Sequence, residues 1–288
     1  MRQILLTLLL LTNLYATKIE FEVLGSGGPE FDGRASTSYL LWIDNRARLI
    51  IDMGSGSMLR FEESGAKIED LEAVVLTHLH IDHSVELPSF VKAGYFSERI
   101  ADLDILAPDG NKQFPSTTEY LETLFGEKGA YRYMSDVLTN DSDSFQILPI
   151  DVKDVQFTDK YKSFHLTLIK VHHGIVPSLA LRIDIGEKSI VITGDTNNVN
   201  RDIELLAMDC DLLVAHHGVP EYAKGYATEL HMKPSGIAHI AKEAKVKKIL
   251  LTHRMKRTIG EEDKTLLEIK KSYKGEVIFA EDREKLEI

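Results

Sequence analysis

Short runs of hydrophobic, often β-branched residues recur along the chain and alternate with longer segments of helical periodicity. Several of these runs are continuous rather than alternating, which is typical of strands that are covered on both faces. The pattern predicts strands at 19–23, 47–53, 73–77, 103–107, 166–171, 179–185, 189–193, 212–215, 248–252 and 276–280. It predicts helices at 84–95, 117–125, 200–208, 235–245 and 263–273.

Strands that alternate with helices indicate an α/β protein whose helices pack outside its sheets. No proline-rich linker or internal repeat divides the sequence, so we expect one domain over residues 17–288. Residues 110–160 are the least regular part and contain more acidic than basic side chains. We expect this segment to be an insertion over one face of the domain rather than a separate domain.

The first sixteen residues, MRQILLTLLLLTNLYA, follow a different pattern. One arginine precedes an apolar run, and the segment ends at the small residue Ala16, which is typical of a secretory signal peptide. The apolar run is too short for a transmembrane helix, so we expect no stable membrane anchor after cleavage. These features predict a signal peptide over residues 1–16 and a periplasmic or secreted mature protein.

Composition narrows the choice of partners and of stabilising bonds. The 288 residues include 34 basic and 45 acidic side chains, a net charge of −11. Because lysine and arginine supply most of the affinity for a phosphate backbone, this balance argues against a nucleic-acid partner. The single cysteine, Cys210, excludes an intramolecular disulfide, and its apolar context favours a small buried residue over a reactive thiol.

The sequence THLHIDH places four metal-type side chains between a predicted strand and a predicted helix. They are His78, His80, Asp82 and His83. Imidazole and carboxylate groups are ligands that zinc prefers, and so many ionisable groups this close would make little structural sense without a cation. A surface cluster of histidines without a ligand is the alternative.

Further ligand-type side chains stand at the ends of later predicted strands. The pair His172 and His173 ends one strand, Asp195 in ITGDT ends another, and His253 in LLTH ends a third. Sites of α/β proteins usually lie at the edge where strands end, so we expect these side chains to meet the THLHIDH loop there.

The series HxHxDH, a later histidine, GDT and LTH resembles the metallo-β-lactamase superfamily, from VLGSGGPE to LLTHRM over nearly all of the mature chain. This resemblance implies a single-domain αββα sandwich with a two-metal site on one edge. Carried over by motif, His78, His80 and His173 would hold one metal. Asp82, His83 and His253 would hold the second, and Asp195 would bridge both. Asp52 matches the aspartate that orients the ligand loop.

Two further segments, HGIVPSLALR and ATELHMKPSGIAHIAKEAK, resemble the branch that contains zinc-type arylsulfatases and tRNase Z. The resemblance implies that His231 donates a proton to the leaving group and that Asp82 helps to manage the proton of the attacking water. In tRNase Z a glutamate in an HEA stretch partners that histidine. Here the region reads VAHHGVPE, which leaves His216 and His217 open as substitutes.

Together with the predicted signal peptide, the resemblance implies an exported hydrolase that cleaves a small anionic ester, an aryl sulfate or a phosphodiester, with a hydroxide bridging two divalent metals. Zinc is the expected metal, and manganese or iron could use the same ligands. Alternatives are a tRNA 3′-processing nuclease, a lactone- or β-lactam-cleaving enzyme, and a metal-binding protein without turnover. A homodimer is a further expectation from the relatives.

Overall fold

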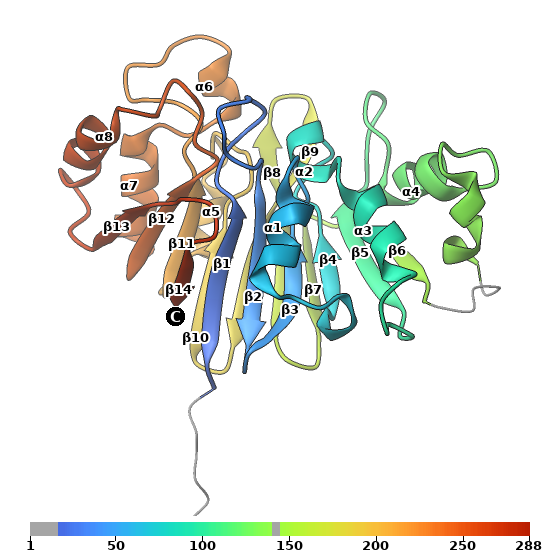
Figure 1. Ribbon diagram of the computed structural model, residues 1–288. Helices are drawn as coiled ribbons and strands as arrows, with labels where there is room; N and C mark the ends of the chain where they lie inside the picture. Colours follow the sequence, from blue (N-terminus) through green and yellow to red (C-terminus); the bar gives the residue numbers. More distant parts are fainter. Residues whose placement is uncertain (1–16, 140–144) are drawn as a thin grey trace, which may run out of the picture.

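Two seven-stranded β-sheets lie face to face and carry helices on their outer surfaces, as Figure 1 shows for the computed structural model. The structure describes residues 17–139 and 145–288. The predicted α/β class and the αββα sandwich are confirmed by this arrangement. The predicted signal peptide, residues 1–16, lies outside the described residues and stays a prediction.

The first sheet combines an antiparallel half with a parallel half. Its strands pair in antiparallel fashion from β14 to β3 and in parallel from β3 to β6. In spatial order they are β14 (Lys285–Glu287), β1 (Ile19–Gly25), β2 (Ser38–Ile43), β3 (Arg46–Ile51), β4 (Ala73–Val75), β5 (Leu103–Pro108) and β6 (Ile147–Val152).

The second sheet has the same mixed construction. Its strands pair in parallel from β13 to β10 and in antiparallel fashion from β10 to β7. In spatial order they are β13 (Glu276–Phe279), β12 (Lys248–Thr252), β11 (Leu212–His216), β10 (Lys188–Ile192), β9 (Val176–Ile185), β8 (His165–His173) and β7 (Gln156–Lys160). Because β8 runs parallel to β10, the ends of β8, β10, β11 and β12 share one sheet edge.

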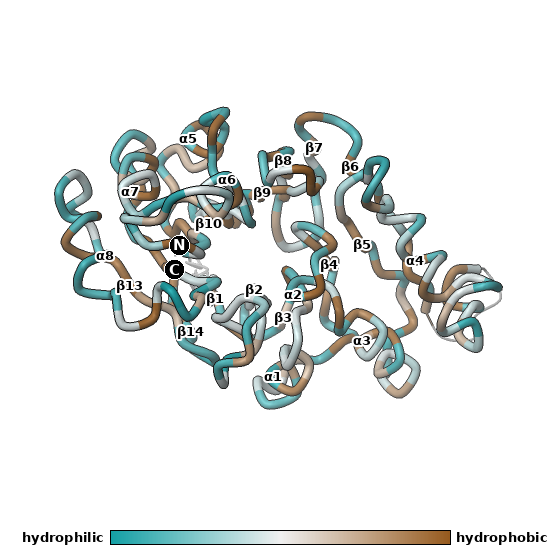
Figure 2. Tube along the Cα trace, turned by 90° about the horizontal axis from the view of Figure 1, so that it is seen from above, coloured by the Kyte–Doolittle hydropathy of each residue, from teal (hydrophilic) through white to brown (hydrophobic). Residues whose placement is uncertain are grey.

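Continuous hydrophobic strands occur because each sheet is covered on both faces. In β2, Leu41 faces the core between the sheets, whereas Leu40 and Trp42 face the helices outside. Figure 2 shows α1 and α3 on one side of the sandwich and α5 and α7 on the other. The helices are α1 (Ser57–Ser64), α2 (Ile81–Ser84), α3 (Leu87–Gly94), α4 (Thr117–Phe125), α5 (Asp202–Leu206), α6 (Ala227–Leu230), α7 (Pro234–Glu243) and α8 (Glu262–Ile269).

The expectation that residues 110–160 form an insertion is wrong for their second half. There β6 pairs with β5 and β7 pairs with β8, so the segment supplies an edge strand to each sheet. In the described part of the first half, α4 and the 3₁₀ helix η2 (Arg132–Leu138) lie outside the sheets. Edge strands bury only part of their surface, and Pro149 is tolerated there, so their sequence pattern is weak.

Two further features of the described chain concern its helices and its single cysteine. None of its helices is long and apolar enough to cross a membrane. Cys210 is fully buried beneath α7, and burial raises the pKa of its thiol to about 12, so the thiol is inert as predicted.

Candidate metal centre

The THLHIDH loop is held in place by the segment that follows β3. Asp52 accepts hydrogen bonds from the backbone N–H and the hydroxyl of Thr77, at 2.6 and 2.8 Å. Two residues further on, Gly54 passes so close to the loop that a Cβ would lie 2.2 Å from the Asp82 carbonyl oxygen. The chain after β3 therefore forms a rigid support under the ligand loop, as the resemblance implied for Asp52.

Two of the side chains at this edge are held by an uncommon backbone conformation. Asp52 follows β3 with φ +59°, and His253 follows β12 with φ +52°. Non-glycine residues rarely adopt this left-handed region, and such strained conformations cluster at functional sites as well as in turns. Sequence reasoning placed both residues at strand ends but gave no signal for this geometry.

Four histidines point one ring nitrogen each at a single oxygen of Asp195. The Nε2 atoms of His78, His83, His173 and His253 lie 3.9, 3.7, 3.6 and 3.5 Å from its Oδ2 atom. All five residues are at least 98% buried. The end of β8 and the loops after β4, β10 and β12 thus converge on one carboxylate oxygen, and this convergence is what the strand-end pattern predicted.

Two of the ring nitrogens that face Asp195 are free to bind a ligand. His83 Nε2 and His173 Nε2 are buried and have no hydrogen-bond partner among the described residues. Their Nδ1 atoms are fixed instead, by Asp52 at 2.7 Å and by the Leu230 carbonyl at 3.0 Å. A ring held by one nitrogen, with the other aimed into a polar centre, has the arrangement of a metal-bound histidine. Buried polar atoms without partners are otherwise rare.

The potential ligands fall into two groups whose donor atoms lie within 4.8 Å of one another. The first group comprises His78, His80, His173 and Asp195, and the second group comprises Asp82, His83 and His253. These are the two sets that the motifs suggested, with Asp195 between them. Nitrogen and carboxylate donors in this number suit divalent zinc, manganese or iron, so the residues present fit two such ions.

Burial and charge act in opposite directions on the groups of this centre. Burial lowers the pKa of His78 and His253 well below the usual value, which leaves neutral rings that can bind a cation. Burial would raise the pKa of Asp195, but the surrounding histidines hold it well below its usual range. For His83 burial is outweighed by the nearby aspartates, chiefly Asp52, and the pKa rises to about 9.

His216, whose role the sequence left open, contacts Asp195 rather than His231. Its Nδ1 atom donates to Asp195 Oδ1 at 2.8 Å, and its Nε2 atom lies 3.0 Å from the Tyr39 hydroxyl. Its ring stacks on His253, with centroids 5.0 Å apart. His216, Asp195 and His253 also form a third group that could hold an ion. However, both nitrogens of His216 already have protein partners, so we assign it to the orientation of Asp195. Its position at the end of β11 was the overlooked signal.

His231 reaches the same centre from the end of α6. It is buried, and its Nδ1 atom, which has no hydrogen-bond partner within residues 17–139 and 145–288, lies 3.7 Å from Asp195 Oδ1. Its ring packs against Gly218, where a Cβ would lie only 2.8 Å away. Burial lowers the pKa of His231 to about 4, so the ring is neutral near pH 7. The structure thus brings His231 to the centre, but as a neutral imidazole.

The neighbouring histidines of the two HH pairs do not point at this centre. His217 is buried beside Thr265, 3.3 Å from its hydroxyl, and faces the ring of Phe279. His172 is only partly buried and belongs to neither ligand group. The choice of His173 over His172 as a potential ligand is therefore consistent with the geometry.

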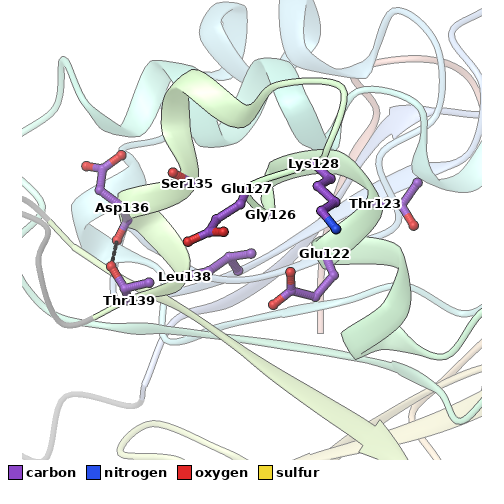
Figure 3. Close-up of a pocket in the computed structure, with 9 residues that line it drawn as sticks. All are labelled: Glu122, Thr123, Gly126, Glu127, Lys128, Ser135, Asp136, Leu138 and Thr139. Carbon is purple, nitrogen blue, oxygen red and sulfur yellow. Dashed lines mark hydrogen bonds between the residues drawn. The ribbon is translucent and has the colours of Figure 1, made fainter.

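A depression of about 850 Å³ lies away from the centre, on α4 and η2 (Figure 3). Its lining carries the carboxylates of Glu122, Glu127 and Asp136 and the ammonium group of Lys128. It contains none of the histidines or of the other residues that surround Asp195. It therefore has no part in the site.

With this geometry described, comparison with known proteins identifies the class. The family model of the metallo-β-lactamase superfamily matches residues 31–233. The chain therefore belongs to the metallo-β-lactamase superfamily.

Individual relatives indicate the branch of the superfamily to which the chain belongs. The chain is 30% identical to the ribonuclease Z of Listeria innocua over 86% of its own length and 92% of that protein. The fold resembles the Bacillus subtilis protein YhfI with a TM-score of 0.73, 22% identity and coverage of 94% and 99% of the two chains. It also resembles the short form of human tRNase Z, with a TM-score of 0.67, 19% identity and coverage of 93% and 98%. The protein is thus a hydrolase of the tRNase Z-like branch.

These relatives bear on two expectations. The main interpretation from the sequence was an exported enzyme that cleaves a small anionic ester, an aryl sulfate or a phosphodiester, with nucleic acid as an improbable partner. Relatives named ribonuclease Z favour the nuclease-like alternative instead. The net charge does not exclude such a partner, because it averages over the whole surface, whereas phosphate binding depends on the few cations beside a site.

Proposed function

We propose that this protein is a two-metal phosphodiesterase that cleaves RNA, with chemistry like that of ribonuclease Z. The observation that carries the proposal is the convergence of four histidine nitrogens on Asp195 Oδ2, with His231 beside it, in a chain similar to ribonuclease Z along most of its length. The first group would hold one divalent ion and the second group the other, with Asp195 shared. Zinc is the proposed metal.

When bound, the two ions would supply Lewis-acid stabilisation and lower the pKa of a water molecule toward neutrality. The protein's own residues have separate tasks. Asp52 fixes the ring of His83, and His216 fixes Asp195 so that Oδ2 faces the centre. Asp82, whose Oδ2 atom lies 3.6 Å from His83 Nε2, is the carboxylate available to accept a proton from the attacking water.

His231 would act on the leaving group. Because its pKa is lowered to about 4, it acts near pH 7 as a neutral hydrogen-bond donor to the leaving oxygen rather than as an imidazolium acid. Such a donor stabilises negative charge that develops as the P–O bond breaks. Replacement by alanine should therefore lower kcat more than it raises KM, and it should do so least for substrates with a good leaving group such as 4-nitrophenolate.

The proposal is tested with three substrates and zinc-loaded protein. Precursor tRNA with a 3′ extension and bis(4-nitrophenyl) phosphate should be hydrolysed, whereas 4-nitrophenyl sulfate should not. His165→Gln, which changes an exposed histidine at the start of β8, is the matched control and should keep full activity. Hydrolysis of the sulfate without either diester would overturn the proposal.

Export is a separate proposal that rests on the sequence of residues 1–16. N-terminal sequencing of the protein made by its own cell should find Thr17 as the first residue. An N-terminus at Met1 in mature protein would refute cleavage after Ala16.

A further inference from the structure

A cavity of about 490 Å³ opens beside His231, on the side where α5, α6 and α7 meet. Both views of the chain place these three helices together (Figures 1 and 2). His231 lines the cavity and its Nδ1 atom lies 3.7 Å from Asp195 Oδ1, so this residue adjoins both the cavity and the ligand groups. Gly236 at the start of α7 also lines the cavity, and a Cβ there would meet no atom within 4 Å. The cavity is thus open space directly next to the centre.

The cavity contains one cation without a partner. Lys233 lines it, is partly buried, and its ammonium group makes no hydrogen bond or ion pair with any residue that the structure describes. Arg201, which also lines the cavity, is already engaged, because its Nε atom donates to Glu204 at 3.1 Å and its guanidinium contacts His239. The charge of Glu204 therefore neutralises that of Arg201, whereas the charge of Lys233 has no partner among the described residues.

We propose that this cavity binds the leaving group of the substrate and that Lys233 binds a phosphate carried by that leaving group. The inference rests on the proposed function, because it uses the role of His231. A residue that donates to the leaving oxygen must lie on the leaving-group side of the scissile bond. The cavity lined by His231 is then where the leaving group lies.

The lining selects the chemical class of that leaving group. A half-buried, unpaired ammonium group favours an anion and offers little to an uncharged aryl ring. In an RNA chain the leaving nucleoside carries the next phosphate of the backbone, which supplies such an anion. Water adds its hydroxyl to phosphorus, the P–O bond to the leaving oxygen breaks, and that oxygen takes up the proton. The nucleotide released into the cavity keeps its phosphate.

The test compares the dinucleotides ApA, pApA and ApAp with zinc-loaded protein. Whichever oxygen departs, one of the two phosphorylated dinucleotides carries its extra phosphate on the leaving nucleoside. That substrate should show a kcat/KM at least about tenfold above that of ApA, the size expected for one charge-assisted hydrogen bond. Lys233→Ala should abolish the preference, mainly through KM, and Lys233→Arg should keep most of it.

Three controls separate this role from a structural one. Lys242→Ala removes the same charge from the far end of α7 and should leave the preference intact. Bis(4-nitrophenyl) phosphate, whose leaving group carries no phosphate, should be hydrolysed equally by wild type and Lys233→Ala. The zinc content of Lys233→Ala should be that of the wild type. A preference that survives in Lys233→Ala, or that is missing in the wild type, would overturn the inference.

The inference that the cavity binds an anion can be tested independently of the proposed function. If no diester at all is hydrolysed, the proposed function fails, and calorimetric titration with adenosine 5′-monophosphate and adenosine then tests the cavity alone. The monophosphate should bind at least about tenfold more tightly than adenosine, and Lys233→Ala should remove that difference. Equal affinities in the wild type, or an unchanged difference in the variant, would refute the anion site.

Discussion

The two ligand groups of the centre differ in how firmly the protein holds them. In the second group, His83 and His253 are buried, and their Nδ1 atoms are held at 2.7 Å by Asp52 and Thr37. In the first group, His80 is partly exposed, and within the described chain its ring has no hydrogen-bond partner except His78. The protein therefore holds the second group rigidly, whereas the first group forms the open side of the centre, where His80 is partly exposed.

This difference teaches how the fold assigns separate tasks to two similar donor sets. A buried carboxylate behind a ligand histidine fixes the ring and increases its basicity, so Asp52 strengthens the second group. The first group depends on neutral partners, such as the Leu230 carbonyl behind His173. We expect the second group to hold its ion permanently, and the first group to be the side where substrate and solvent enter.

The largest effect should come from the carboxylate that both groups share. Asp195→Ala removes the oxygen on which four histidine nitrogens converge, so both ions should be lost and diester hydrolysis should fall by more than about 100-fold. Elemental analysis of purified protein measures the metal. Asp154→Ala, at an exposed turn, is the control. Retention of both ions would show that the two groups do not depend on Asp195.

A selective effect is expected from Asp52→Asn. This change removes the charge behind His83 but keeps a side chain of the same shape, so affinity for the ion of the second group should fall about 10- to 100-fold. The ion of the first group should be retained. Titration of metal-free protein with zinc measures both affinities. Thr37→Val removes a neutral anchor from His253 and should weaken the same ion less. Equal loss from both groups would contradict the comparison.

A smaller effect should appear in the order of metal release. Because His80 is partly exposed, the ion of the first group should leave first when a chelator is added, and that of the second group more slowly. Cobalt-loaded protein allows the two losses to be followed by absorbance, with released metal measured by an indicator dye. Simultaneous loss of both ions would remove the distinction between an open and a closed side.

Much of the centre could be predicted from the sequence because its residues follow strands. The THLHIDH loop, His173, Asp195 and His253 all come directly after hydrophobic runs, and parallel strands bring such positions to one edge. The same rule could have indicated His216 at the end of β11, but no familiar motif surrounds it. Its contact with Asp195 depends on the stagger of neighbouring strands, which the pattern of one strand does not contain.

Other elements were not predicted from the sequence, for different reasons. Strand β2 was missed although it is buried along its whole length, and β6 was assigned to an insertion because its exposed positions interrupt the apolar pattern. The predicted helix at 84–95 proved to begin earlier, as α2, and to break before α3, where Ser84 is the last residue of α2 and donates to the His80 carbonyl. Local hydrogen bonds of the ligand loop override the helical periodicity there.

His217 points at neither ligand group, so its effect on acid stability is a reference for that of the ligand histidines. Burial lowers the pKa of His217 to about 4, while in the unfolded chain it is near 6.5. The unfolded chain therefore binds more protons between these values, so the free energy of unfolding falls as the pH drops from about 6.5 to 4, by roughly 3 kcal/mol from this group.

His217→Gln should abolish that share of the acid sensitivity without changing the zinc content, because the ring of His217 points toward Thr265 and not toward Asp195. Urea unfolding at pH 7 and pH 5 measures how far the free energy of unfolding falls with pH in the wild type and in the variant. Loss of zinc in the variant would instead place His217 within reach of the second group. Unchanged acid sensitivity would mean that the ligand histidines, rather than this one, set the acid limit of the fold.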